Sequence, residues 1–172
     1  DFYTNDHLEK LYEEITSRKN PIALFFTGVK ELKNNSLSDP EIEKLDSNNP
    51  INFFLTTAII PGRICGHRSI FTQEKFDEDI VIVEDLCLWA RVAEKFKVYQ
   101  VPQNTVIYAI HEENSIHLGS NAGERKLRSL KIFLNRYQLL MTKAEKHTKK
   151  MLLTDCHFRI AQSCIYRNLR FK

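Results

Sequence analysis

The sequence predicts an α/β fold, on three observations. A nearly continuous apolar run over residues 22–29 follows Pro21 and ends in polar residues, which is typical of a buried strand. Apolar residues recur at helical spacing over residues 85–96. Immediately afterwards, residues 97–101 and 105–110 are rich in β-branched and aromatic side chains, as strands are. Strands and amphipathic helices therefore alternate along the chain.

The first half of the chain is predicted to begin with a helix from Asn5 to about Arg18. Its apolar residues have helical spacing, and Thr4 or Asn5 can cap it. The buried strand comes next. Residues 34–50 are polar and rich in turn-forming residues, so we expect a surface excursion there, with a helical turn at residues 40–45.

The middle of the chain is less regular. Residues 51–60 are apolar and fit either a helix or a strand. The Pro61-Gly62 turn then leads to a short strand over residues 63–67 and a helical turn over residues 70–75. Of the two later strands, the first is expected to stop at Pro102, because proline cannot donate to a sheet ladder.

The C-terminal part is predicted to form two basic amphipathic helices, over residues 122–142 and 144–170. Their apolar residues have the spacing of packing faces, and residues 119–123 form a flexible join before them. We therefore divide the chain into a first part, residues 1–120, and a helical extension, residues 121–172.

Composition and cysteine usage are those of an ordinary soluble chain. Of the 172 residues, 42% are hydrophobic and 27% charged, and no apolar run approaches the ~20 residues of a membrane span. This predicts a cytoplasmic protein with free thiols, because no Cys-x-x-Cys spacing relates its four cysteines, Cys65, Cys87, Cys156 and Cys164.

Charge is divided unevenly along the chain. The stretch from Glu124 to Lys172 carries a balance of +10, whereas the residues before it carry −7. A solvated helical face explains the basic surplus most simply, and an anionic membrane surface bound through residues 124–172 is the second interpretation. Nucleic acid is not expected as a partner, because the basic stretch has no recognised motif and no stacking platform.

The adjacent carboxylates Glu84 and Asp85 are the main candidates for chemistry. They lie where the acidic run from Phe76 to Ile80 gives way to the helix at residues 85–96. Acidic residues at a helix start commonly satisfy free backbone N–H groups. The same pair can instead serve as a general base or as metal ligands.

Residues Phe76 to Ser115 follow the pattern "FDE…EDLDLWLRIAKKYK…P…YRIHENNSS" in order, and in this the chain resembles a bacterial family-2 GT-A glycosyltransferase. The match is close over about the central forty residues. Asp1-Phe2 also resembles the residues just after that family's metal-binding Asp-x-Asp motif. The resemblance implies the C-terminal, acceptor-side part of a GT-A (Rossmann-like) fold with a mixed sheet, without the nucleotide-binding half.

The resemblance also implies a reaction. A sugar would pass from a nucleotide-sugar donor to a saccharide or lipid-linked acceptor with inversion, in polysaccharide biosynthesis. Asp85 would be the general base, with Glu84 near the acceptor, and His111 would complete a metal shell or contact the diphosphate. The divalent cation, Mn²⁺ or Mg²⁺, would be held mainly by the absent half. The chain departs from the family at Ala109, where arginine is common, and we expect it to be inactive alone.

Four further residues are substrate-binding candidates. Arg63 and His67 follow the Pro-Gly turn and can line the acceptor cleft. Trp89 lies at helical spacing behind Asp85, where a core position is the simpler interpretation and a sugar-stacking platform the other. Arg91 can approach the acidic pair or remain exposed.

The alternative hypothesis is a non-catalytic interaction module whose basic helices bind a protein partner or an anionic membrane surface. A half-enzyme at the inner membrane face is expected to expose a strand edge and apolar surface that the missing half would cover. A stand-alone module is expected to lack such an open edge, so this feature separates the two hypotheses.

Overall fold

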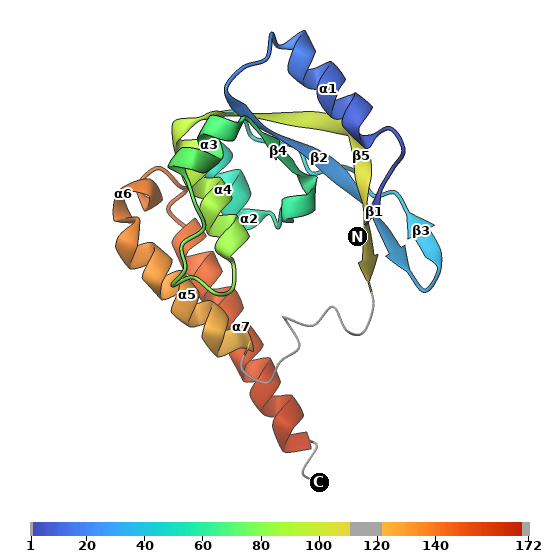
Figure 1. The fold of residues 1–172 in the computed structure, drawn as a ribbon. Helices are drawn as coiled ribbons and strands as arrows, with labels where there is room; N and C mark the ends of the chain where they lie inside the picture. Colours follow the sequence, from blue (N-terminus) through green and yellow to red (C-terminus); the bar gives the residue numbers. More distant parts are fainter. Residues whose placement is uncertain (1, 111–121, 170–172) are drawn as a thin grey trace.

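A computed structural model describes residues 2–110 and 122–169. The fold is α/β, with a mixed sheet between one helix and a larger group of helices (Figure 1). Its elements are β1 (Phe2–Tyr3), α1 (His7–Ser17), β2 (Ala23–Lys33), β3 (Ser36–Ser38), α2 (Pro50–Thr56), the 3₁₀ turn η1 (Pro61–Arg63), β4 (Ile64–Gly66), α3 (Arg68–Gln73), α4 (Glu84–Lys95), β5 (Lys97–Ile110), α5 (Ala122–Arg136), α6 (Gln138–Met141) and α7 (Thr148–Leu169).

The sheet is built around the parallel pair β2 and β5. Strand order is β1-β5-β2-β3, and β4 also pairs with β2. The β1–β5, β2–β3 and β2–β4 pairs are all antiparallel. The sheet is therefore mixed, and the α/β class predicted from the sequence is confirmed.

The continuous apolar run of β2 is explained by burial on both of its faces. Leu24 and Phe26 belong to the main hydrophobic core, on the side of α2, α4, α5 and α7. Ala23 and Phe25 alternate with them and pack in a smaller cluster with Leu11 of α1. Successive strand side chains point to opposite faces, so a strand covered on both sides has no polar alternation.

The main core continues from the sheet-side helices into the C-terminal helices. Leu88 of α4 and Phe54 of α2 share one cluster with Phe133 of α5 and Leu152 of α7. The chain division predicted at residue 120 stays a prediction, and the hydrophobic packing is continuous across it. No helix in the described part of the chain is long and apolar enough to cross a bilayer.

Pro102 does not end a strand, contrary to the sequence-based expectation. β5 runs unbroken from Lys97 to Ile110, and its pairing with β2 shifts register between Phe26 and Gly28. The shift lets the longer segment Gln100–Asn104 face the shorter segment Phe26–Gly28. Proline is tolerated at such an irregularity because no ladder bond is demanded of it there.

The helical turn expected at residues 40–45 is also wrong. That segment has no helix, and its backbone is held by the side chain of Gln100 instead. Gln100 Oε1 accepts a hydrogen bond from the Leu45 N–H at 2.8 Å, and Gln100 Nε2 donates to the Glu43 carbonyl at 2.6 Å. The ambiguous stretch 51–60 begins as α2, which Asn49 caps by accepting from the Asn52 N–H.

Candidate functional site

Glu84 and Asp85 occupy the first turn of α4, and both are half-buried. Asp85 Oδ1 accepts a hydrogen bond from the Leu86 N–H at 2.7 Å. The N-cap residue, Val83, makes no side-chain capping bond, so the carboxylates are the negative groups closest to the positive end of the helix. This placement leaves part of each side chain open to solvent.

Val83 has a left-handed backbone, with φ 67° and ψ 21°. A β-branched residue rarely adopts this conformation, which costs on the order of 1–3 kcal/mol. Such strain persists only where the surroundings impose it, and it gathers at functional sites. The segment before Val83 must therefore be held firmly, and the acidic pair begins directly after it.

That segment, residues 74–83, is called the anchored loop below. Helix α4 holds its first residues. Arg91 Nη1 donates to Glu74 Oε2 at 3.1 Å, and Arg91 Nη2 donates to the Lys75 carbonyl. Lys95 pairs with the second oxygen of Glu74, whose side chain is only 5% exposed. A buried carboxylate with two cationic partners fixes where the loop leaves α3.

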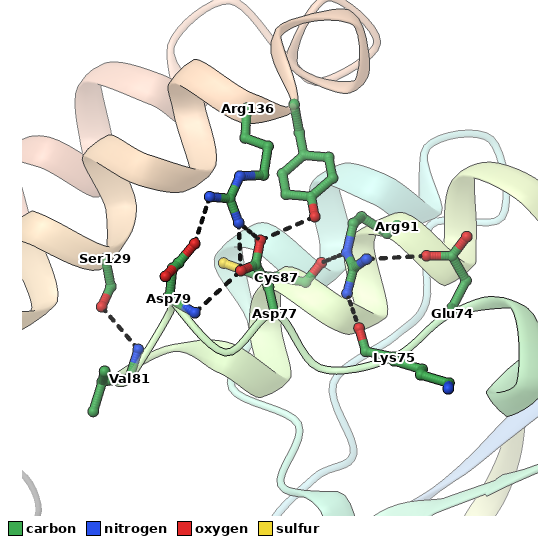
Figure 2. A network of polar contacts seen from close by, with 10 residues as sticks. Glu74, Lys75, Asp77, Asp79, Val81, Cys87, Arg91, Ser129 and Arg136 are labelled. Atoms are coloured by element: carbon green, nitrogen blue, oxygen red, sulfur yellow. Dashed lines mark hydrogen bonds and ion pairs between the residues drawn. The ribbon is translucent and has the colours of Figure 1, made fainter.

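Helix α5 holds the middle of the anchored loop (Figure 2). Arg136 Nη1 lies 2.5 Å from Asp77 Oδ1, and Arg136 Nη2 lies 2.6 Å from Asp79 Oδ2. Tyr137 adds a hydroxyl bond to Asp77 at 3.1 Å. The buried Ser129 hydroxyl accepts from the N–H groups of Val81 and Ile82, at 3.2 and 3.4 Å.

The electrostatics of Asp77 follow from these contacts. Burial alone would raise the pKa of its carboxyl group. Hydrogen bonds from Arg136, from the Asp79 N–H and from Tyr137 favour the charged form more strongly, so the pKa lies below the usual value for aspartate. Asp77 is therefore ionised at neutral pH, and its negative charge is matched by Arg136.

Two of the predicted substrate-binding residues lie inside the fold. Arg63 is 2% exposed; its Nε donates to the Thr27 carbonyl at 2.7 Å and its Nη2 pairs with Glu43 at 3.1 Å. Trp89 is 3% exposed, and its indole N–H donates to the Ile59 carbonyl at 2.9 Å. Both side chains have their polar atoms directed at protein groups, and neither presents a surface to a sugar.

The other candidates lie on different elements. His67 is exposed and caps α3, with Nδ1 2.7 Å from the Ser69 hydroxyl and accepting from the Ser69 N–H at 3.3 Å. Arg91 shares α4 with the acidic pair, but its guanidinium is engaged by the anchored loop and lies over the Tyr137 ring. His111, the predicted metal residue, lies outside the described residues.

Sequence reasoning missed Ser129, Arg136 and Tyr137 as parts of this site. Asp77 and Asp79 lie in the acidic run that precedes Glu84 and Asp85, so the sequence does indicate the loop itself. Arg136 belongs to the basic surplus that the sequence leaves open between a solvated helical face and a membrane-binding surface. No local pattern pairs an arginine with a carboxylate that lies 59 positions earlier in the chain.

The described residues do not by themselves supply a metal site. No group of three His, Cys, Asp or Glu side chains among residues 2–110 and 122–169 could hold an ion. A surface hollow of about 740 Å³ lies at the other end of α4, lined by residues 94–100 together with Arg18, Leu45, Ser47 and Pro50. At 1.5 Å per residue, that end is roughly 15 Å along the helix from the acidic pair.

Comparison with known proteins adds no relative: no family model, no curated protein and no solved structure matches this chain. Its function is therefore argued from its own residues and fold.

Proposed function

We propose that this chain is the acceptor-side part of an inverting, nucleotide-sugar-dependent glycosyltransferase with a GT-A fold. One observation carries the proposal. The Glu84-Asp85 pair begins α4 directly after the strained Val83, at the end of a loop that side chains of α4 and α5 hold in place. The residue pattern from Phe76 to Ser115 supports the same assignment.

The proposed reaction requires a general base from the described residues. An acceptor hydroxyl attacks the anomeric carbon, its proton passes to the Asp85 carboxylate, and the bond to the departing nucleoside diphosphate breaks with inversion. A positioned base of this kind contributes on the order of 10²–10⁴-fold. Glu84, one position earlier, would orient the acceptor. A bound Mn²⁺ or Mg²⁺ would neutralise the leaving group, and its ligands would lie outside the described residues.

An open strand edge supports a part-enzyme over a stand-alone module. Among the described strands, β4 pairs only with β2, so its other edge has no strand partner. Phe71, 38% exposed, lies against Gly66 of this strand. Phe2 and Tyr3 of β1 are 59% and 58% exposed. These are the features expected where another part of an enzyme would cover the sheet.

The test is made on the protein expressed with its native upstream coding region. Hydrolysis and transfer are assayed with UDP-, GDP- and dTDP-sugars and Mn²⁺. Asp85→Asn should lower turnover by about 10²-fold or more, because the acceptor loses its base. Asp46→Asn is the matched control, since Asp46 is exposed and an amide oxygen can still accept from the Asn48 N–H. Unchanged turnover in Asp85→Asn would remove Asp85 from its role.

A second arm tests the 172-residue chain by itself. We expect it to show no transfer, because the residues proposed to bind the donor are not in it. Sugar transfer by this chain alone would contradict the assignment of an incomplete catalytic unit.

The second candidate function is a module that binds an anionic membrane surface. Six exposed basic side chains on and near α5 and α7 have no acidic partner among the described residues: Arg125, Arg128, Lys131, Lys146, Lys149 and Lys150. Each can contribute ~1 kcal/mol near an anionic surface. Sedimentation with phosphatidylserine vesicles tests this; retention that falls in Lys149→Gln/Lys150→Gln favours it, and equal binding to phosphatidylcholine vesicles opposes it.

A further inference from the structure

The conformation of the anchored loop depends on side chains from other elements. Residues 74–83 contain no helix or strand, and the described main-chain bonds that start within them are few: Glu74 N–H to Ile70 and Ile80 N–H to Asp77. A loop with so little backbone bonding samples many conformations unless other groups restrain it. The acidic pair follows this loop without a spacer.

The guanidinium of Arg136 restrains the middle of the loop. It bridges two carboxylates two residues apart, contacting Asp77 at 2.5 Å and Asp79 at 2.6 Å. The two acidic groups would repel each other in this arrangement without a cation between them. The planar guanidinium can donate to both carboxylates at once, whereas a lysine ammonium is a single point charge. The Asp77 side chain is 8% exposed, so this half of the bridge is poorly screened by solvent.

The restraint reaches the acidic pair through a short piece of chain. Ser129, about two turns before Arg136 on α5, accepts from the N–H groups of Val81 and Ile82, and the Ile80 and Ile82 side chains are buried. These contacts hold residues 77–82 on α5, and Val83, directly after them, has the left-handed conformation with which α4 begins at Glu84.

We propose that Arg136 is a positioning residue for Glu84 and Asp85, acting through Asp77 and Asp79, and that α5 is therefore part of the acidic site. The catalytic consequence of this positioning role rests on the proposed function. The structural part of the proposal, that Arg136 fixes residues 77–85, is supported by the contacts among the described residues alone.

Hydrogen exchange on the 172-residue chain tests the structural part. In Arg136→Gln, amide protection over residues 79–86 should fall by about tenfold or more, because the loop opens more often. Arg68→Gln is the matched control: it removes the same charge from an exposed arginine of α3 that has no acidic partner among the described residues. Combining Arg136→Gln with Asp77→Asn and Asp79→Asn should add little to the loss seen with the two Asp→Asn changes alone.

Kinetics on the protein with its upstream region test the catalytic part. Arg136→Gln should lower kcat by ~10²-fold with little change in KM for the acceptor, since a base displaced by about 1 Å loses rate and not binding. Arg136→Lys should recover part of the loss. A merely destabilised protein would instead keep kcat per folded molecule.

The outcomes distinguish failure of the positioning role from failure of the proposed function. If Asp85→Asn abolishes turnover while Arg136→Gln matches Arg68→Gln in both kcat and exchange, the positioning role is overturned and the proposed function stands. If Asp85→Asn keeps full turnover, Asp85 is not the base, the catalytic part of the inference fails, and the exchange result alone decides whether Arg136 holds the loop. No turnover with any donor in the wild-type protein would overturn the proposed function itself. Protection unchanged over residues 79–86 in Arg136→Gln overturns the inference in either case.

Discussion

Single residues show how far a sequence determines the direction of a side chain. Arg63 follows a Pro-Gly turn, where an exposed cation is the usual expectation, and it is buried instead. The cause lies in β2, because Thr27 stands at the register shift and has no paired residue on β5. Arg63 supplies a donor to the Thr27 carbonyl at 2.7 Å. A buried polar group needs such a hydrogen-bond partner, and no local pattern near Arg63 predicts that its partner is the Thr27 carbonyl.

Asp77 gives a pH-dependent prediction at the same scale. Its pKa in the folded state is lower than in the unfolded chain, so its stabilising contribution is complete above about pH 4 and is lost as the pH falls through the folded-state value. Asp77→Asn should therefore lower the free energy of unfolding by ~1–3 kcal/mol at pH 7, and the difference from wild type should shrink below about pH 4. Urea unfolding at several pH values measures this.

Glu41→Gln is the control for that experiment. The Glu41 side chain is 88% exposed and its contact with Lys44 is 4.0 Å long, so its removal should change stability by less than ~0.5 kcal/mol at every pH. A difference between wild type and Asp77→Asn that stays constant from pH 7 to pH 3 would contradict the assignment of an ionised Asp77 to the bridge.

At the scale of elements, periodicity predicted most helices and strands and failed where a distant group decided the outcome. The helices near residues 5–18 and 85–96 and the strand at 22–29 need only their own apolar spacing, and they appear as α1, α4 and β2. The turn expected at residues 40–45 was wrong because Gln100 supplies the backbone partners there. Pro102 was misjudged because a register shift, which no local pattern reports, makes room for it.

The contact between α5 and α7 gives an element-scale prediction. A Cβ on Gly123 would lie 2.8 Å from Ile160 Cγ1 and 3.2 Å from the Ile160 main-chain nitrogen, so the two helices touch closely at this point. Gly123→Ala should push them apart and lower the free energy of unfolding by ~1–3 kcal/mol, measured by urea unfolding.

Gly62→Ala is the matched substitution, because its Cβ would meet only the Tyr3 hydroxyl at 3.7 Å. The free energy of unfolding of Gly62→Ala should stay within about 1 kcal/mol of the wild-type value. Equal stability of the two variants would show that α5 and α7 can separate at Gly123 without loss.

The whole molecule unfolds, we predict, as one unit. Leu130, Phe133 and Leu152 share the main core with the helices of the first part, so removing residues 121–172 would leave α2 and α4 with an uncovered apolar face. Fluorescence of Trp89, the single tryptophan, and far-UV circular dichroism should follow coincident transitions in urea. Two separated transitions would instead support independent parts on either side of residue 120.

The bridge between Arg136 and Asp77 also sets an order of events during folding. Its partners are 59 positions apart, and contacts of such long sequence separation close late because chain entropy opposes them. While the chain is being synthesised, the loop ahead of Glu84 and Asp85 is complete long before α5 leaves the ribosome. The acidic pair therefore takes its final geometry only once α5 has formed and packed against this loop.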